Sequence, residues 1–66
     1  MDKYELKRRL NTIEQNINTI ETNLSLLEKD GKFNEKDILT IKAFKNIINS
    51  PKELLKSLED TVNNLE

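Results

Sequence analysis

The side chains that most often carry chemistry in proteins are scarce in this sequence. Its 66 residues include no cysteine and no histidine, so the usual thiol nucleophile, imidazole base and zinc ligands are missing. The single glycine, Gly31, cannot build a glycine-rich phosphate-binding loop. Ser25, Ser50 and Ser57 have no histidine to activate them. We therefore expect a protein that is not an enzyme and that binds neither a cofactor nor a metal ion.

The carboxylates that remain are arranged for a helix surface rather than for catalysis. Glu14, Glu21 and Glu28 recur every seven residues, which places them on one flank of a helix. A carboxylate-bridged di-metal bundle would also require Glu-x-x-His units on its helices, and the sequence contains none. The glutamates are expected to form a solvated column at heptad position e.

An apolar heptad stripe predicts the helix that carries these glutamates. Its members are spaced alternately four and three residues apart, from Leu6 to Leu27. Positions a of the heptad are Leu10, Ile17 and Leu24; positions d are Leu6, Ile13, Ile20 and Leu27. The stripe predicts a helix over residues 2–29.

A turn and a second apolar arm follow this helix. Gly31 lies where a left-handed helix cap is needed, and Asn34 can cap the next helix, so we expect a turn over 30–34 and a helix over 35–49. Ser50-Pro51-Lys52-Glu53 matches a capping box with proline at the first helical position, which predicts a further helix over 51–65. The three-and-four spacing of apolar residues continues from Ile41 to Leu65 without a change of phase.

The predicted fold is a single all-α domain, an antiparallel helical hairpin whose second arm is kinked at Pro51. Residues 2–29 and 35–65 make arms of matching length, which favours this arrangement. The alternative is a three-helix bundle in which residues 51–65 fold back. Because a chain of this size buries little surface and has no disulfide or zinc to stabilise it, we expect two hairpins to dimerise into a four-helix bundle.

Apolar residues outside the a and d stripe indicate protein interaction surfaces. Ile47 and Leu54 hold g positions on the second arm and are the predicted oligomer interface. Leu26, Phe33, Ile38 and Leu39 surround the hairpin tip and are the predicted partner-binding site. Their presence favours a small regulator or inhibitor that docks on a larger protein. A structural or scaffolding coil is an alternative.

A nucleic-acid interface is the other alternative. Lys3, Lys7, Arg8 and Arg9 cluster near the amino terminus and could contact phosphates. A dimer of such hairpins resembles in architecture the plasmid Rop proteins, which are RNA-binding dimers of helical hairpins, but no motif matches beyond the helical repeat, and a shared fold does not imply a shared function. The formal net charge is only -1, and the acidic end of the second arm, with Glu59, Asp60 and Glu66, would lie beside the basic cluster. We therefore do not expect nucleic acid to be the main partner.

Location and source are indicated only by composition. No apolar run is long enough to act as a secretory signal or to span a membrane, so a cytoplasmic protein is expected. Nine asparagines, nine lysines and seven isoleucines are typical of an AT-rich genome, which suggests a low-GC bacterium or one of its phages or mobile elements.

Overall fold

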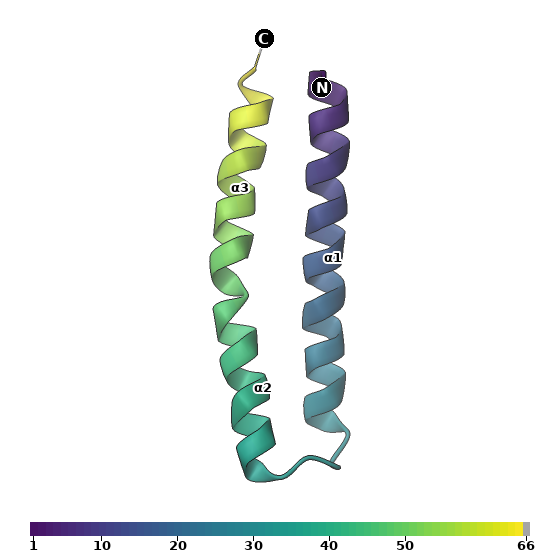
Figure 1. The fold of residues 1–66 in the computed structure, drawn as a ribbon, viewed down its shortest axis with the longest axis vertical. Helices are drawn as coiled ribbons and strands as arrows, with labels where there is room; N and C mark the ends of the chain where they lie inside the picture. Colours follow the sequence, from purple (N-terminus) through teal and green to yellow (C-terminus); the bar gives the residue numbers. More distant parts are fainter. Residues whose placement is uncertain (66) are drawn as a thin grey trace.

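The computed structural model describes residues 1–65 and confirms an all-α hairpin with a bent second arm. Helix α1 runs over Lys3–Lys29, α2 over Glu35–Ile47 and α3 over Asn49–Asn63. Figure 1 shows α2 and α3 as one arm that lies antiparallel to α1, with both chain ends at the same end of the molecule. Residues 51–65 continue the second arm instead of folding back, so the three-helix alternative is not the arrangement seen. None of the described helices is long and apolar enough to cross a membrane.

Helix α1 begins and ends on side chains suited to those positions. The Asp2 carboxylate accepts a hydrogen bond of 2.8 Å from the Glu5 amide, which satisfies one of the free N–H groups of the first turn. Lys29 in the last turn complements the negative end of the helix dipole. Gly31 follows with φ of 80°, a conformation that other residues rarely adopt. The chain therefore reverses where the only glycine allows it.

Helix α2 has the amino-terminal cap that the sequence predicts. The side-chain oxygen of Asn34 accepts a hydrogen bond of 2.9 Å from the Asp37 amide. Glu35 and Asp37 in the first turn add negative charge at the positive end of the helix dipole.

The join between α2 and α3 corrects the predicted capping box. Ile48, with helical φ and ψ of -67° and -14°, occupies the N-cap position, and no side chain caps α3. Ser50 therefore lies inside the helix and cannot act as its cap. Pro51 has no amide to donate to the Ile47 carbonyl and its ring crowds that carbonyl, whereas Lys52 still donates to the Ile48 carbonyl at 3.3 Å. One backbone bond is lost, and the arm bends without reversing.

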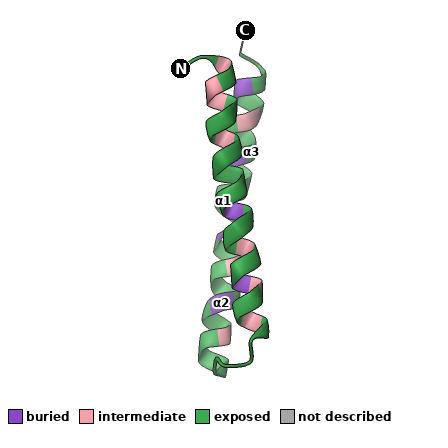
Figure 2. Ribbon diagram, turned by 90° about the vertical axis from the view of Figure 1, so that its right-hand side faces the viewer, coloured by how far each residue is buried: buried purple, intermediate pink, exposed green. Residues whose placement is uncertain are grey.

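A single column of apolar residues forms the core between the two arms. The buried side chains on α1 are Ile17 and Leu24, and those on the second arm are Ile41, Ile48, Leu55 and Val62. Each set repeats every seven residues, so all of them hold heptad position a. Figure 2 shows the buried residues only along the line where the arms meet, with exposed surface over most of both helices.

The d column stays half-exposed. Six residues at position d have 41% to 53% of their surface exposed; they are Ile13, Ile20, Leu27, Phe44, Leu58 and Leu65. The reason is geometric: one straight helix covers only a narrow strip of its neighbour. The hairpin is accordingly long and thin, with extents of 51 × 16 × 13 Å.

Asn34, which caps α2, and Ser50, which caps no helix, provide a matched test of these helix ends. Asn34→Ala should lower the free energy of unfolding by about 1 kcal/mol, because the Asp37 amide loses its acceptor. Ser50→Ala should change it by less than about 0.5 kcal/mol, because Ser50 caps nothing. Urea unfolding followed by circular dichroism measures both. Equal losses would show that Ser50 does cap α3 in solution.

Candidate functional site

One side of the seam carries charged residues from both arms in register. Lys45 Nζ lies 3.1 Å from Glu28 Oε2, and Lys52 Nζ lies 3.1 Å from Glu21 Oε2. All four residues hold position e of the heptad, one turn after a buried residue. These side chains are partly exposed, so each pair contributes roughly 0.2 to 1 kcal/mol. The glutamate column predicted to be solvated is thus solvated only in part, because Glu21 and Glu28 pair with lysines of the second arm.

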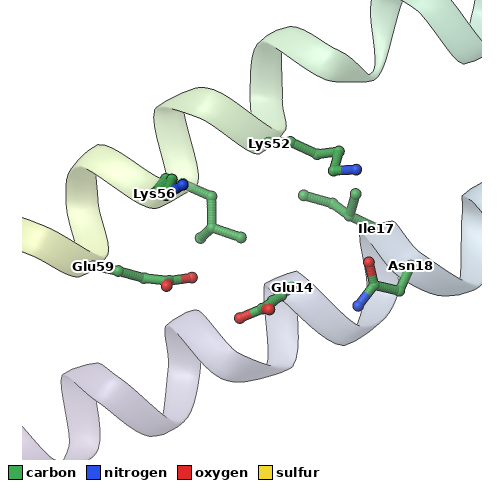
Figure 3. A pocket seen from close by; sticks show the side chains of 7 residues that line it. Glu14, Ile17, Asn18, Lys52, Lys56 and Glu59 are labelled. Atoms are coloured by element: carbon green, nitrogen blue, oxygen red, sulfur yellow. The ribbon is translucent and has the colours of Figure 1, made fainter.

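One heptad beyond the Glu21–Lys52 ion pair, two acids face each other on the same side of the seam. Figure 3 shows the carboxylates of Glu14, from α1, and Glu59, from α3, in one groove between the arms. The groove has a volume of about 260 Å³ and is lined by Glu14, Ile17, Asn18, Lys52, Leu55, Lys56 and Glu59. Partial burial raises the pKa of the Glu59 carboxyl, and the charge and hydrogen bond of Glu14 raise it further. Asp60 also raises that pKa, while Lys56 opposes the shift.

The acid pair offers little chemistry beyond holding a proton. Among residues 1–65, no three acidic, cysteine or histidine side chains come together as metal ligands. Lys52 and Lys56 also line the groove, and they would repel a cation placed between the carboxylates. The groove is therefore best understood as an imperfect step in the alignment of the arms.

The opposite side of the hairpin is an uncharged face. On a helix, position d lies about 60° to one side of position a, and position e about 40° to the other. Because the ion pairs place both e columns on one side, both d columns share the other. We define the uncharged face as positions c, d and g over residues 10–28 and 40–65. Every charged residue in these ranges lies at b, e or f instead.

The predicted oligomer interface belongs to this face. Ile47 and Leu54 are 70% and 67% exposed, and they adjoin the half-exposed d residues of the second arm. The sequence did not separate the isoleucines and leucines at d on α1 from the core, yet the structure leaves them open beside the second arm. The positions of the charges could have identified the exposed side in the sequence. The lysines and glutamates at position e can pair only if both e columns lie on the same side of the seam, which leaves both d columns on the other side.

The predicted tip site is divided between two surfaces. Phe33, Ile38 and Leu39 line one shallow hollow at the start of α2, together with Glu35 and Lys42. Leu26 lines a different hollow formed by residues of α1 alone. Leu26 and Leu39 are 61% and 66% exposed, so neither is a core residue.

Two residues of the predicted basic cluster have polar partners within the hairpin. Lys3 donates from Nζ to the carbonyls of Asn63, at 3.2 Å, and Leu65, at 2.8 Å. It thereby satisfies free carbonyls at the carboxyl end of α3 and complements the helix dipole there. Arg9 pairs with Glu5 at 3.4 Å.

The other two basic residues point elsewhere. Lys3, Lys7, Arg8 and Arg9 occupy heptad positions a, e, f and g, and Lys7 lines a second groove that includes Glu59. The contact of these residues with nucleic acid stays a prediction. The expected contribution of Glu66 lies outside the described residues.

Comparisons with known proteins identify no relative. No protein-family model matches the sequence, and no curated protein or solved structure shows significant similarity to it. Any inference about its function must therefore start from the arrangement of residues in the hairpin.

The acid pair should make stability depend on pH in a definite direction. A carboxyl whose pKa is raised in the folded state binds its proton more tightly there than in the unfolded chain, so its contribution to stability is greatest at low pH and is lost as the pH rises through the folded pKa. Glu59→Gln should therefore raise the melting temperature at pH 7, with a gain that shrinks as the pH falls toward about 4. Thermal melts by circular dichroism measure this.

The matched control is Glu53→Gln, which removes an exposed acid on the outer side of α3. It should leave the melting temperature nearly unchanged at both pH values. A gain from Glu59→Gln that stayed constant down to pH 3 would show that charge repulsion at Glu14 is not its cause.

The two tip leucines can be tested as surface residues. Leu26→Lys and Leu39→Lys should each keep helicity and change the free energy of unfolding by about 0.5 kcal/mol or less. The prediction that the tip binds a partner requires in addition that one of these variants loses that partner. A loss of several kcal/mol in stability would instead place the substituted leucine in the core.

Proposed function

We propose that this chain is a small, non-enzymatic protein-interaction module that docks helices onto its uncharged face. The observation that carries the proposal is the half-exposed d column, which runs along both arms on the side away from the ion pairs. Ile47 and Leu54 widen it on the second arm. Apolar surface of this continuity on a small protein is typical of an interaction site.

The composition of the face supports this proposal. Bulk hydrophobicity alone does not distinguish interfaces, but depletion of charged residues at their centre does. The uncharged face has isoleucine, leucine and phenylalanine at its centre and asparagine, threonine and serine toward its rim. Ala43, Ser50 and Ser57, at position c of the second arm, are small enough to let another helix approach closely.

Helices are the class of partner that fits this surface. The face is long and built on the seven-residue repeat, which matches the recognition of amphipathic helices in a groove or bundle. Two versions use the same geometry: self-association into a four-helix bundle, and docking on a helical surface of a larger protein. The second version corresponds to a regulator or inhibitor, such as phages and mobile elements encode. A scaffolding coil would use the face in the same way but in larger assemblies.

Site-specific photo-crosslinking tests the proposal. A benzophenone amino acid at Leu54 would report contacts of the uncharged face, and the same residue at Asn46 would report the outer side of α2 as a matched control. After irradiation of cells that express each variant, we expect discrete protein adducts from position 54 and none from position 46. Mass spectrometry then identifies the adducts and their stoichiometry.

The opposite pattern would overturn the proposal. Adducts from position 46 but not from position 54 would place the interaction on the outer side of the hairpin. Adducts from a third probe at Leu39, with position 54 silent, would assign it to the tip. No adducts from any position would leave the uncharged face without a partner, and the proposed function would be wrong.

A further inference from the structure

We propose that the partner on the uncharged face is a second copy of this chain, docked tip to tail so that α1 packs antiparallel on the α1 of its copy. This inference rests on the proposed function, because it uses the same face. It adds the identity of the partner and the orientation in which that partner binds. Three independent features of the hairpin support it: surface area, spacing of the apolar residues and charge.

The isolated hairpin exposes more surface than a folded chain of its mass normally does. Its accessible surface is 5468 Å², whereas a typical monomer of 7.7 kDa exposes about 4,300 Å². The excess is about 1,100 Å² by the same scaling. A face 51 Å long and 16 Å wide has a projected area of roughly 800 Å², which is what each partner buries in a standard stable interface. A single second copy would thus cover most of the excess.

The apolar residues of the face are spaced symmetrically about its centre. On α1, Ile13 and Leu27 lie seven residues before and after Ile20; on the second arm, Phe44 and Leu58 lie seven before and after Pro51. The ion pair of Lys52 with Glu21 sets Pro51 and Ile20 at nearly the same height. Consider a two-fold axis that passes through Ile20 and Pro51 at right angles to the helices. It would place the apolar row of α1 against the same row of the second copy, and likewise for the second arm. Symmetric dimers require such a self-complementary patch.

Charges at the two ends of the face favour this axis over the other possible one. Arg9 in α1 and Asp30, the C-cap of α1, both hold position g and lie at nearly equal distances from Ile20. In the tip-to-tail dimer, Arg9 of each copy therefore lies level with Asp30 of the other. A tip-to-tip dimer would instead set Asp30 of one copy beside Asp37 of the other, with Lys36 and with Lys32, whose Nζ lies 4.0 Å from Asp30 Oδ2, as the cations that offset them. Opposite charges at these ends select the antiparallel docking.

The middle of the α1 contact is polar in a way that suits a dimer. Asn16 and Asn23 hold the g positions on either side of the centre, and both are exposed in the hairpin. The proposed axis places Asn16 of one copy beside Asn23 of the other. Paired amides can donate and accept hydrogen bonds across the interface, whereas unpaired ones there would be costly to bury.

Sedimentation equilibrium with charge-reversal variants tests both parts of the inference. The wild-type chain should sediment with twice the mass of one 7.7 kDa chain at micromolar concentration. Arg9→Asp and Asp30→Arg should each weaken dimerisation about tenfold at low salt, because each change breaks two symmetric pairs. The double variant should return to within about twofold of wild type, since the pairs are restored with reversed sign. Arg8→Asp, at outward position f, is the matched control and should change little.

Disulfide trapping gives an independent measure of orientation, because the sequence has no cysteine of its own. An equimolar mixture of Asn16→Cys and Asn23→Cys chains should form the mixed disulfide, and neither chain alone should crosslink efficiently. Failure of the double charge reversal to restore binding, together with no mixed disulfide, would overturn the tip-to-tail orientation.

A wild-type chain that stays monomeric to 100 μM would overturn the second copy as partner. This failure is distinguishable from failure of the proposed function. A monomer whose residue 54 probe still crosslinks to a different protein would keep the interaction module and replace the partner. A monomer with no adduct from that probe would reject both.

Discussion

The structure depends on one constraint: two helices that meet along a line can each bury a single column of side chains. The a column fills that line, from Ile17 and Leu24 on α1 to Val62 near the end of α3. Every other apolar residue of the repeat must then lie beside the seam. Since the ion pairs occupy one side, the d column and its neighbours are left on the other. The surface proposed to bind a partner is thus a direct result of building a domain from only two arms.

The charged side of the seam contains two ion pairs that match the alignment of the arms and one pair of acids that opposes it. Glu21 and Glu28 each meet a lysine, and these contacts set which turns of the two arms lie side by side. The same alignment forces Glu14 against Glu59, whose raised pKa reflects partial burial and that neighbour. A shift of the arms by one turn would separate the acids but would also break both ion pairs. The structure therefore keeps the repulsion, and a groove opens where the two acids face each other.

The fold was largely predictable from the sequence, while the division of its surface was not. Heptad spacing predicted both arms, and Gly31 with Asn34 predicted the turn and the following cap. The capping motif at Ser50 was misleading, because the helical phase continues through Pro51 and α3 begins before the serine. The roles of the a and d columns could not be separated either, since both are apolar and only the alignment of two distant segments decides which is covered.

Folding and association draw on the same apolar columns in this molecule. No side chain among residues 1–65 is completely buried, and the sequence has no cysteine to form a disulfide, so the core alone provides modest stabilisation against the cost of ordering the chain. Any partner that covers the uncharged face binds the folded hairpin and not the unfolded chain, and so shifts the folding equilibrium by mass action. Burial of Ile20, Phe44, Ile47, Leu54 and Leu58, which are 41% to 70% exposed in the hairpin, would stabilise the fold by about 25 cal/mol for each Å² of apolar surface removed from water. The uncharged face that is proposed to bind the partner would therefore also provide stabilisation that the core between the two arms does not provide.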